Sequence, residues 1–277
     1  MRRRAPALRL SVVGFIPVEW LRKIDNVMLV AIDIGNTNVK VGLFDKDNLQ
    51  QLLRMPRTSH APTDGRLEAW ADANSVVIAS VVPDATAGWI EAAHGHFGSE
   101  PLVVHSGLDC GLTIAYQPPH SLGADRLANA VAACHLYGAP CIAVDLGTAT
   151  TFNVVTQSGD ESLPVFRGGA ICAGAGIIAR SLAAGTAQLP AVSLTRPRSA
   201  LADNTTDSLQ SGLFFGYAAM IDGIVLRLRQ EIDAPGCPVI ATGGGAGEQL
   251  IAECRSITHI DPALTLHGLR IIHERNR

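Results

Sequence analysis

The sequence predicts an α/β protein made of two similar halves with a cleft between them, and three observations lead to this prediction. Apolar runs of strand length first cluster and then alternate with helical patterns. The stretch IDIGNTNVK, residues 32–40, has a counterpart in VDLGTATTF, residues 144–152. A chain of 277 residues, 47% of them apolar, is long enough for one large domain or two medium ones with buried cores.

The two related stretches have the same local pattern. Asp33 and Gly35 in the first copy correspond to Asp145 and Gly147 in the second, with aliphatic residues between them in both. Each copy begins as an apolar run, breaks at Asp-aliphatic-Gly-polar and resumes as a β-rich run. Both copies therefore predict a strand, a tight turn and a second strand.

The elements that follow each hairpin repeat in a similar order, which places the halves at 28–140 and 141–277. A helix over 124–137 is indicated by Leu127, Ala130 and Val131 on one face. In chain order we expect strands over 75–82, 101–105 and 111–116, helices over 85–97 and 124–137, a hairpin from 141, a glycine-rich loop over 167–176, helices over 177–184 and 207–232, a strand over 237–242, a glycine-rich turn over 243–247 and a further helix.

Residues 1–27 differ from the rest of the chain in charge. They hold six Lys or Arg against two acids, whereas the remainder is acidic. A basic start followed by an apolar run imitates a signal peptide, but the run is short, contains Pro17 and has no small-residue cleavage site after it. We expect Met28 to be the functional start and residues 1–27 to be a disordered or mis-assigned extension.

Composition excludes several function classes. The six cysteines lack CxxC pairs and zinc-like spacing and lie mostly in apolar segments, which is typical of free thiols in a reducing cytoplasm. An acidic body with 5% aromatic residues gives no footprint for nucleic acid. After residue 27, no apolar run approaches the roughly 18 residues of a membrane span. The sequence predicts a cytoplasmic protein that binds neither nucleic acid nor membrane.

The repeated turns suit a phosphate chain with its metal ion. Gly35 and Gly147 allow close backbone approach, Thr37 and Thr148 offer hydroxyls, and the aspartates can hold a cation. Asp-x-Gly is also ordinary hairpin chemistry. Two copies favour the first interpretation, because two opposed loops can grip one nucleotide. This arrangement resembles the phosphate motifs of the superfamily of actin, sugar kinases and heat-shock ATPases.

In that superfamily an adenosine loop lies late in the chain, and VIATGGGAGEQL, residues 239–250, is the candidate here. A plain turn from strand to helix is its alternative. Other phosphate motifs fail: GxxxxGK[ST] is absent, and GAGIIA at 174–179 lacks the acid expected about 20 residues on. HGH at 94–96 has no third ligand nearby and is expected to be a solvated helix end.

Seven motifs in order and spacing resemble the type III pantothenate kinases. They are DIGNTN, Y…P…LGADRLANAVAA, VDLGTATTF, GGAI, LP at 189–190, NTTDSLQSGLFFGY and ATGGGAG, and they cover the chain from Met28 to about Asn276. The resemblance implies ATP-dependent phosphorylation of pantothenate to 4'-phosphopantothenate in coenzyme A synthesis. It also implies two actin-like, ribonuclease-H-like halves, use of Mg²⁺ and of K⁺ or NH₄⁺, and a homodimer.

The same resemblance assigns roles to individual residues. It places ATP on Asp33, Ile34, Gly35, Asn36, Thr37, Asn38, Val39, Lys40 and Thr148, the monovalent cation on Asp145, and pantothenate on Tyr116, Gly123, Ala124, Asp125, Arg126 and Thr205, with Asp125 as the proton acceptor. One departure is Ala173 in GGAICAG, where the family usually has Pro, and it leaves the conformation of that loop open.

The chemistry of pantothenate agrees with the Asp-Arg pair. The molecule has a carboxylate at one end and a primary hydroxyl at the other, and a guanidinium can clamp the first while a carboxylate accepts a proton from the second. A sugar kinase of the same superfamily and a nucleotide-binding regulator are the alternatives. In the helix over 207–232, Gly212, Gly216 and Met220 form one row, which indicates either internal packing or a dimer interface.

Overall fold

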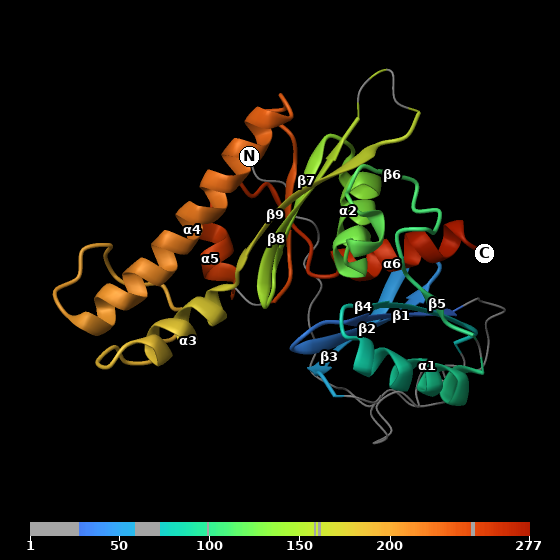
Figure 1. Ribbon diagram of the computed structural model, residues 1–277, viewed down its shortest axis with the longest axis horizontal. Coiled ribbons are helices and arrows are strands. Elements are labelled where there is room, and N and C mark those ends of the chain that lie inside the picture. The colour runs from blue at the N-terminus through green and yellow to red at the C-terminus, as the bar shows by residue number, and fades with distance from the viewer. Residues whose placement is uncertain (1–27, 59–72, 99, 158, 160–161, 245–246) are drawn as a thin grey trace. The chain divides into compact units, whose positions relative to one another are not determined.

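The computed structural model in Figure 1 consists of two compact units, Met1–Val104 and His105–Arg277. It describes residues 28–58, 73–98, 100–157, 159, 162–244 and 247–277. The expected extension over residues 1–27 lies outside the described residues.

The first unit is a five-stranded sheet with one described helix. Its elements are β1 (Met28–Ile34), β2 (Asn38–Asp45), β3 (Asn48–Pro56), β4 (Ser75–Ser80), α1 (Pro83–Phe97) and β5 (Leu102–Val103). The strand order is β3-β2-β1-β4-β5, in which β1 is antiparallel to β2 and parallel to β4. β1 and β4 are continuous apolar runs because they are buried in the middle of the sheet.

Helix α1 covers this sheet and closes its core. The indole of Trp89 is 1% exposed and packs in one cluster with residues of β1, β2 and β4, among them Ile32 and Ile78. Pro83 begins the helix, where the missing amide proton costs nothing, and Gly98 ends it in the left-handed conformation with φ of 60°.

The second unit is a six-stranded sheet with helices on both faces. Its elements are β6 (Thr113–Ile114), a 3₁₀ turn η3 (Pro119–Ser121), α2 (Ala124–Tyr137), β7 (Cys141–Leu146), β8 (Ala149–Thr156), β9 (Val165–Ala173), α3 (Ala175–Gly185), α4 (Thr205–Glu231), β10 (Val239–Thr242), α5 (Gly247–Glu253), β11 (His259–Ile260) and α6 (Leu264–Arg275). The strand order is β11-β10-β7-β8-β9-β6. Figure 1 shows α4 and α5 on one side of β7–β9 and α2 and α6 on the other.

The two sheets have the same topology. β1 to β5 of the first unit correspond to β7 to β11 of the second: three antiparallel neighbours follow each other in sequence, and two parallel strands are added beside the first of them. β6 is an extra edge strand next to β9. The expectation of an α/β chain with two similar actin-like halves is thereby confirmed. The expected cleft concerns the placement of one unit against the other and stays a prediction.

Several elements differ from the expectation. The segment 167–176, taken as a glycine-rich loop, is largely strand β9, in which Ala173 is the last residue and pairs with Ala149. Strand β3 was missed because NLQQLLRMP lacks clear alternation. After the turn over 243–247 the sequence predicted one further helix, whereas the structure has α5, β11 and α6. The strands expected over 101–105 and 111–116 are only two residues long.

The compact units do not divide the chain at the predicted position. The boundary expected between 140 and 141 lies inside the second unit, because α2 packs against β7, β8 and α6. The division by internal repeat, 28–140 and 141–277, stays a prediction. All six cysteines are free, and four of them are buried.

Helix α4 is a core helix on one side and exposed on the other. Its start is capped by Asn204, whose side chain accepts the amide proton of Asp207. By length and composition it is the one helix among the described residues that could cross a membrane. In this structure Phe214, Tyr217 and Ile221 are buried in the cluster that also holds β7 and β10.

Helices α2 and α6 approach each other closely at one glycine. A Cβ added to Gly268 would overlap the backbone of Ala128, so no larger residue fits without moving a helix. We expect Gly268→Ala to lower the free energy of unfolding by about 1–3 kcal/mol, as overpacked cores do. Urea denaturation followed by circular dichroism measures this.

Gly95→Ala is the matched control, because a Cβ at this exposed position in α1 meets nothing within 4 Å. Alanine there favours the helix and should leave stability unchanged or slightly higher. Equal stability of the Gly268→Ala and Gly95→Ala variants would contradict the close approach of α2 and α6.

Candidate active site

The first turn lies between β1 and β2 and contains the predicted ATP loop. Asp33, the last residue but one of β1, is 8% exposed and lies opposite Lys40 in the antiparallel pair. The Lys40 ammonium is 3.6 Å from the Asp33 carboxylate, so that buried charge is paired.

The turn itself presents its polar residues outward. The Gly35 amide donates to the Asn38 carbonyl at 3.0 Å, and a Cβ on Gly35 would lie 3.1 Å from that oxygen. Arg57 donates to the carbonyls of Asn36 and Thr37 at 2.8 and 2.9 Å, while the side chains of both residues are exposed. The eight predicted loop residues, 33 to 40, thus comprise the end of β1, the turn and the start of β2.

The second turn lies between β7 and β8 and differs from the first in one respect. Asp145 is again the last residue but one of its strand, but Thr151 lies opposite it where the first turn has Lys40. Gly147 donates to Ala149 at 3.2 Å, and Thr148 is exposed. No cationic side chain therefore faces Asp145 across the hairpin.

Asp145 instead receives a neutral donor. The side-chain amide of Asn129 on α2 donates to its Oδ2 at 3.1 Å. Oδ1 points toward the turns at Gly147 and Gly243, since a Cβ there would lie 3.5 and 2.5 Å from it. Within the part of the chain that the structure describes, no hydrogen bond reaches Oδ1. A carboxylate oxygen beside two glycine turns fits an oxygen-seeking cation.

Asp125 lies in the first turn of α2, at the end of the segment LGAD. The backbone amide of Arg126 donates to its Oδ1 at 2.7 Å. Burial raises the pKa of Asp125, the Arg126 amide lowers it in part, and the negative charge of Asp145 raises it further. The two carboxyl groups are thus close enough to influence each other.

Arg126 is buried, with its guanidinium held by neutral partners. Nε donates to Asn153 Oδ1 at 2.8 Å and Nη1 donates to the Tyr116 hydroxyl at 3.3 Å. The guanidinium lies over the rings of Tyr116 and Phe166, 5.3 and 5.8 Å from their centroids. Nη2 is buried and has no partner among the described residues. The arrangement leaves one donor of a fixed cation for an anionic ligand.

The other predicted pantothenate residues of this region have structural roles as well. Gly123 precedes α2, and its carbonyl accepts the first helical bond, from Leu127 at 3.0 Å. Ala124 is 6% exposed. Contacts within the second unit thus bring together Tyr116, Asp125, Arg126 and Asp145.

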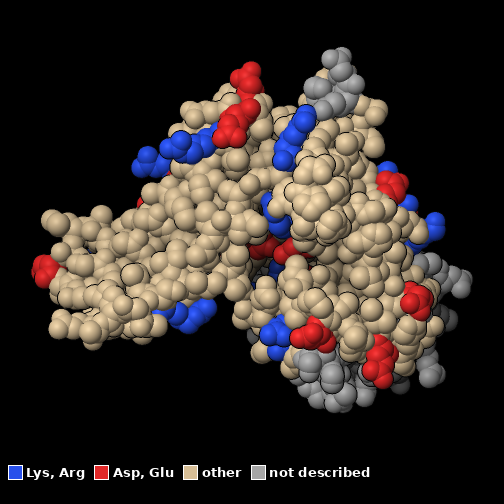
Figure 2. Space-filling model, in the orientation of Figure 1, with Lys and Arg blue, Asp and Glu red and all other residues tan. Residues whose placement is uncertain are grey.

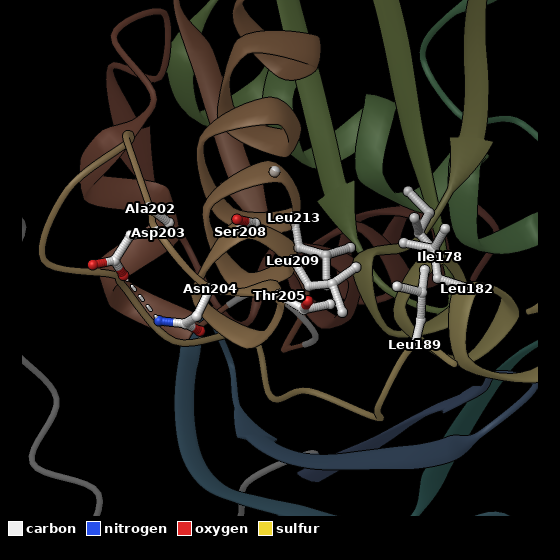
Figure 3. Close-up of a pocket in the computed structure, with 11 residues that line it drawn as sticks. Ile178, Leu182, Leu189, Ala202, Asp203, Asn204, Thr205, Ser208, Leu209 and Leu213 are labelled. Carbon is white, nitrogen blue, oxygen red and sulfur yellow. Dashed lines mark hydrogen bonds between the residues drawn. The ribbon is translucent and has the colours of Figure 1, made fainter. Parts of the chain in front are cut away.

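Thr205 is not part of this group. It begins α4 and lines a cavity of about 690 Å³ between α3 and the start of α4, together with Leu182, Leu189 and Leu209. Figure 3 shows Thr205 among these leucines, with Asn204 and Asp203 joined by a hydrogen bond beside it. None of the residues grouped around α2 lines this cavity.

The exposed side of α4 adjoins this cavity. Between Asp207 and Asp222 the helix has no charged residue, and in Figure 2 the visible surface over α3 and α4 is mostly uncharged. Gly212 and Gly216 are exposed, and a Cβ on either would meet nothing within 4 Å. These two glycines therefore do not serve internal packing, whereas Met220, the third residue of the row, is partly buried against the core cluster, so both alternatives for the row stay open.

The candidate adenosine loop is described only in part, since residues 245–246 lie outside the described residues. Gly243 follows β10 with φ of 91°, a conformation that favours glycine. Thr242, which pairs with Asp145 in the sheet, has a buried hydroxyl without a partner among the described residues. Among all the residues that the structure describes, no three His, Cys, Asp or Glu side chains are grouped to hold a metal ion.

Comparison with known proteins decides the family. The family model described as type III pantothenate kinase matches residues 29–227. The chain belongs to the type III pantothenate kinase family. The type III pantothenate kinase of Anaeromyxobacter sp. (strain K) is 40% identical over 263 residues, with 90% of this chain and 100% of the relative covered. That of Shouchella clausii (strain KSM-K16) is 38% identical over 263 residues, with the same coverage. The resemblance found in the motifs is confirmed.

Solved structures of lower similarity also align with this pantothenate kinase family member. Component A of (R)-2-hydroxyglutaryl-CoA dehydratase from Acidaminococcus fermentans aligns with a TM-score of 0.49 and 12% identity, covering 91% of this chain and 100% of that one. The ROK hexokinase from Thermus thermophilus aligns with a TM-score of 0.44 and 13% identity, covering 88% and 98%.

Two residues that hold the site together were missed from the sequence. Asn129 follows Asp125 by four residues, a spacing that places both on one face of a helix and could have indicated a shared role. Asn153, which orients Arg126, lies in β8, and only the pairing of strands brings it there.

The raised pKa of Asp125 makes a prediction about stability. The folded-state pKa of this partly buried acid lies above the ordinary value of 3.8, so its ionisation costs folding free energy as pH rises through the interval between the two values. We expect Asp125→Asn to raise Tm at pH 7 and the gain to shrink toward pH 4. Thermal unfolding at several pH values measures this.

Asp109→Asn is the control of opposite sign. The Gly111 amide and the Arg275 guanidinium lower the pKa of exposed Asp109, so its ionised form supports the fold and the variant should have a lower Tm at pH 7. A Tm for Asp125→Asn below that of the wild type at pH 7 would show that Asp125 is not destabilising.

Proposed function

We propose that this chain transfers the γ-phosphoryl group of ATP to the primary hydroxyl of pantothenate, giving 4'-phosphopantothenate and ADP in the first step of coenzyme A synthesis. Membership of the type III pantothenate kinase family supports this directly. The structural observation behind the proposal lies at the start of α2. There Asp125, a carboxyl with a raised pKa, adjoins the buried guanidinium of Arg126, whose Nη2 has no partner among the described residues.

Arg126 and Asp125 would divide the recognition of pantothenate between them. The unpartnered Nη2 of Arg126 suits a carboxylate, and the Tyr116 hydroxyl that accepts from Nη1 lies beside it. Asp125 would orient the hydroxyl and accept its proton as the new P–O bond forms and the bond to ADP breaks. Because phosphoryl transfer passes through a loose transition state, positioning should contribute more than basicity.

We assign ATP to residues 33–40 and Thr148 in their two turns. Exposed backbone and the hydroxyls of Thr37 and Thr148 suit phosphate oxygens. Asp33 would hold Mg²⁺, whose bound charge offsets that of the phosphates. We assign K⁺ or NH₄⁺ to Asp145, since its Oδ1 has no protein donor among the described residues and no cationic residue faces it across the hairpin.

We further propose a cytoplasmic homodimer formed through the uncharged, exposed side of α4. Gly212 and Gly216 leave room for close approach of another helix. Thr205 lies in a different part of the unit from Asp125 and Arg126, so its expected contact with pantothenate would require the site of a second copy.

The test of the function is ADP release by the purified chain with ATP and Mg²⁺, with and without pantothenate. We expect release to depend on pantothenate and not on glucose. Release with glucose alone would indicate a sugar kinase, and release independent of both would indicate a different role for the nucleotide.

We expect Asp125→Asn to lower kcat by about 10²–10⁴-fold, the usual contribution of a general base, while the protein stays folded. The amide oxygen can still accept from the Arg126 amide, so local structure should persist. Asp109→Asn, with its exposed carboxyl, serves as the control and should keep normal turnover. Near-normal kcat in Asp125→Asn would remove that residue from the proposed role.

We expect Arg126→Lys to raise KM for pantothenate at least about tenfold and KM for ATP much less. The planar guanidinium bonds Asn153 and Tyr116 and still has Nη2 for the ligand, whereas a lysine ammonium cannot do all three. Hydrogen bonds to charged groups contribute about 1.5–3 kcal/mol each. Steady-state kinetics with each substrate varied in turn measures the split. Equal changes in both KM values would contradict the carboxylate clamp.

A further inference from the structure

Asp145 is held by a chain of two buried side chains, Asn129 and Thr265, to which the resemblance assigns no role; Asn129 lies within the motif LGADRLANAVAA and Thr265 lies outside the motifs. Asn129 is fully buried and donates from Nδ2 to Asp145 Oδ2 at 3.1 Å. Thr265 is 1% exposed, and its hydroxyl donates to Asn129 Oδ1 at 2.8 Å. These bonds connect α6, α2 and the end of β7 in one line.

The chemistry of the three groups fixes the direction of this chain. A carboxylate only accepts, so the Asn129 side chain must turn its NH₂ toward Asp145. Its carbonyl oxygen then faces the opposite way and needs a donor, because an unsatisfied buried polar group is costly. Thr265 supplies that donor. Without the hydroxyl, the amide keeps its bond to Asp145 but loses the donor that satisfies its oxygen and holds the side chain in place.

The consequence is a difference between the two oxygens of Asp145. Oδ2 is occupied by the Asn129 amide, while Oδ1 faces Gly147 and Gly243 without a partner among the described residues. Rotation of the carboxylate would exchange these roles, and the bond from Asn129 opposes that rotation. The close approach of α2 and α6 at Gly268, one helical turn after Thr265, keeps Thr265 within reach.

We propose that Asn129, oriented by Thr265, is a positioning residue that presents Oδ1 of Asp145 to the monovalent cation. This inference rests on the proposed role of Asp145 as the cation ligand. Thr265 lies beyond residues 29–227 that the family model matches, so the C-terminal helix contributes to the active centre through it. Groups that orient a metal ligand typically affect metal affinity about 10–100-fold.

Thr265→Val tests the proposal, because valine keeps the shape of threonine and removes the donor. The readout is the Tm of the purified chain without substrates, titrated with KCl against choline chloride at constant ionic strength. We expect the wild type to gain Tm specifically with K⁺, and Thr265→Val to need at least about tenfold more K⁺ for the same gain. Thr265→Ser, which keeps the hydroxyl, should resemble the wild type.

Two further variants keep the test decisive. Asp145→Asn should lose the K⁺-specific gain altogether. If Thr265→Val does not fold, Thr265→Ala removes the same hydroxyl with less crowding and is titrated in its place. A lower Tm for Thr265→Val with the same gain as the wild type at each K⁺ concentration would show that the hydroxyl serves stability alone, and the proposal would be rejected.

The outcome is separable from that of the kinase function. A wild-type Tm that responds equally to KCl and choline chloride overturns the cation site and this proposal together. Pantothenate-dependent ADP release is scored independently, so a kinase without a cation site on Asp145 remains recognisable. Conversely, a K⁺ shift that depends on Thr265, without pantothenate-dependent ADP release, would retain the positioning role and reject the substrate.

Discussion

The burial of the central strands is the constraint on which the rest of the site depends. β1 and β7 lie in the middle of their sheets, so a carboxylate is tolerated there only near the strand end and only with a partner. Asp33 and Asp145 both occupy the last position but one. The first is paired with Lys40 and the second receives the Asn129 amide. This choice of partner separates two turns that are otherwise alike.

That difference gives the two turns different electrostatic properties. The carboxylate of Asp33 lies beside a positive charge. Asp145 receives a neutral donor from Asn129, and its negative charge acts on Asp125 across the start of α2. Burial is the main cause of the raised pKa of Asp125, and a cation placed on Asp145 would weaken the repulsion that adds to it. The charges of Asp125 and Asp145 are therefore coupled, and a change at Asp145 should alter the pKa of Asp125.

The sequence was sufficient for the turns and for the start of α2, because their signals are local. Asp-x-Gly at the end of an apolar run and Asp-Arg in a first turn need no knowledge of distant contacts. The segment 167–176 was misjudged because its glycines indicate a loop, whereas pairing with β8 makes most of it a strand. Thr265 and Asn153 reach the site through the packing of helices and the register of strands, which sequence spacing does not encode. Thr205, assigned by resemblance, lies in another part of the unit.

The surroundings of Arg126 have a consequence for selectivity. Its guanidinium is bonded to an amide and a phenol and lies over two rings, and the structure describes no acidic side chain bonded to it. A buried cation bonded to uncharged groups is screened less than it would be in water, and the neighbouring Asp125 carboxyl interacts with it electrostatically. If Arg126 binds a carboxylate as proposed, these surroundings should select ligands by charge before shape: a molecule of the same outline with an amide or alcohol in place of the acid would give the guanidinium no counter-charge and bind weakly.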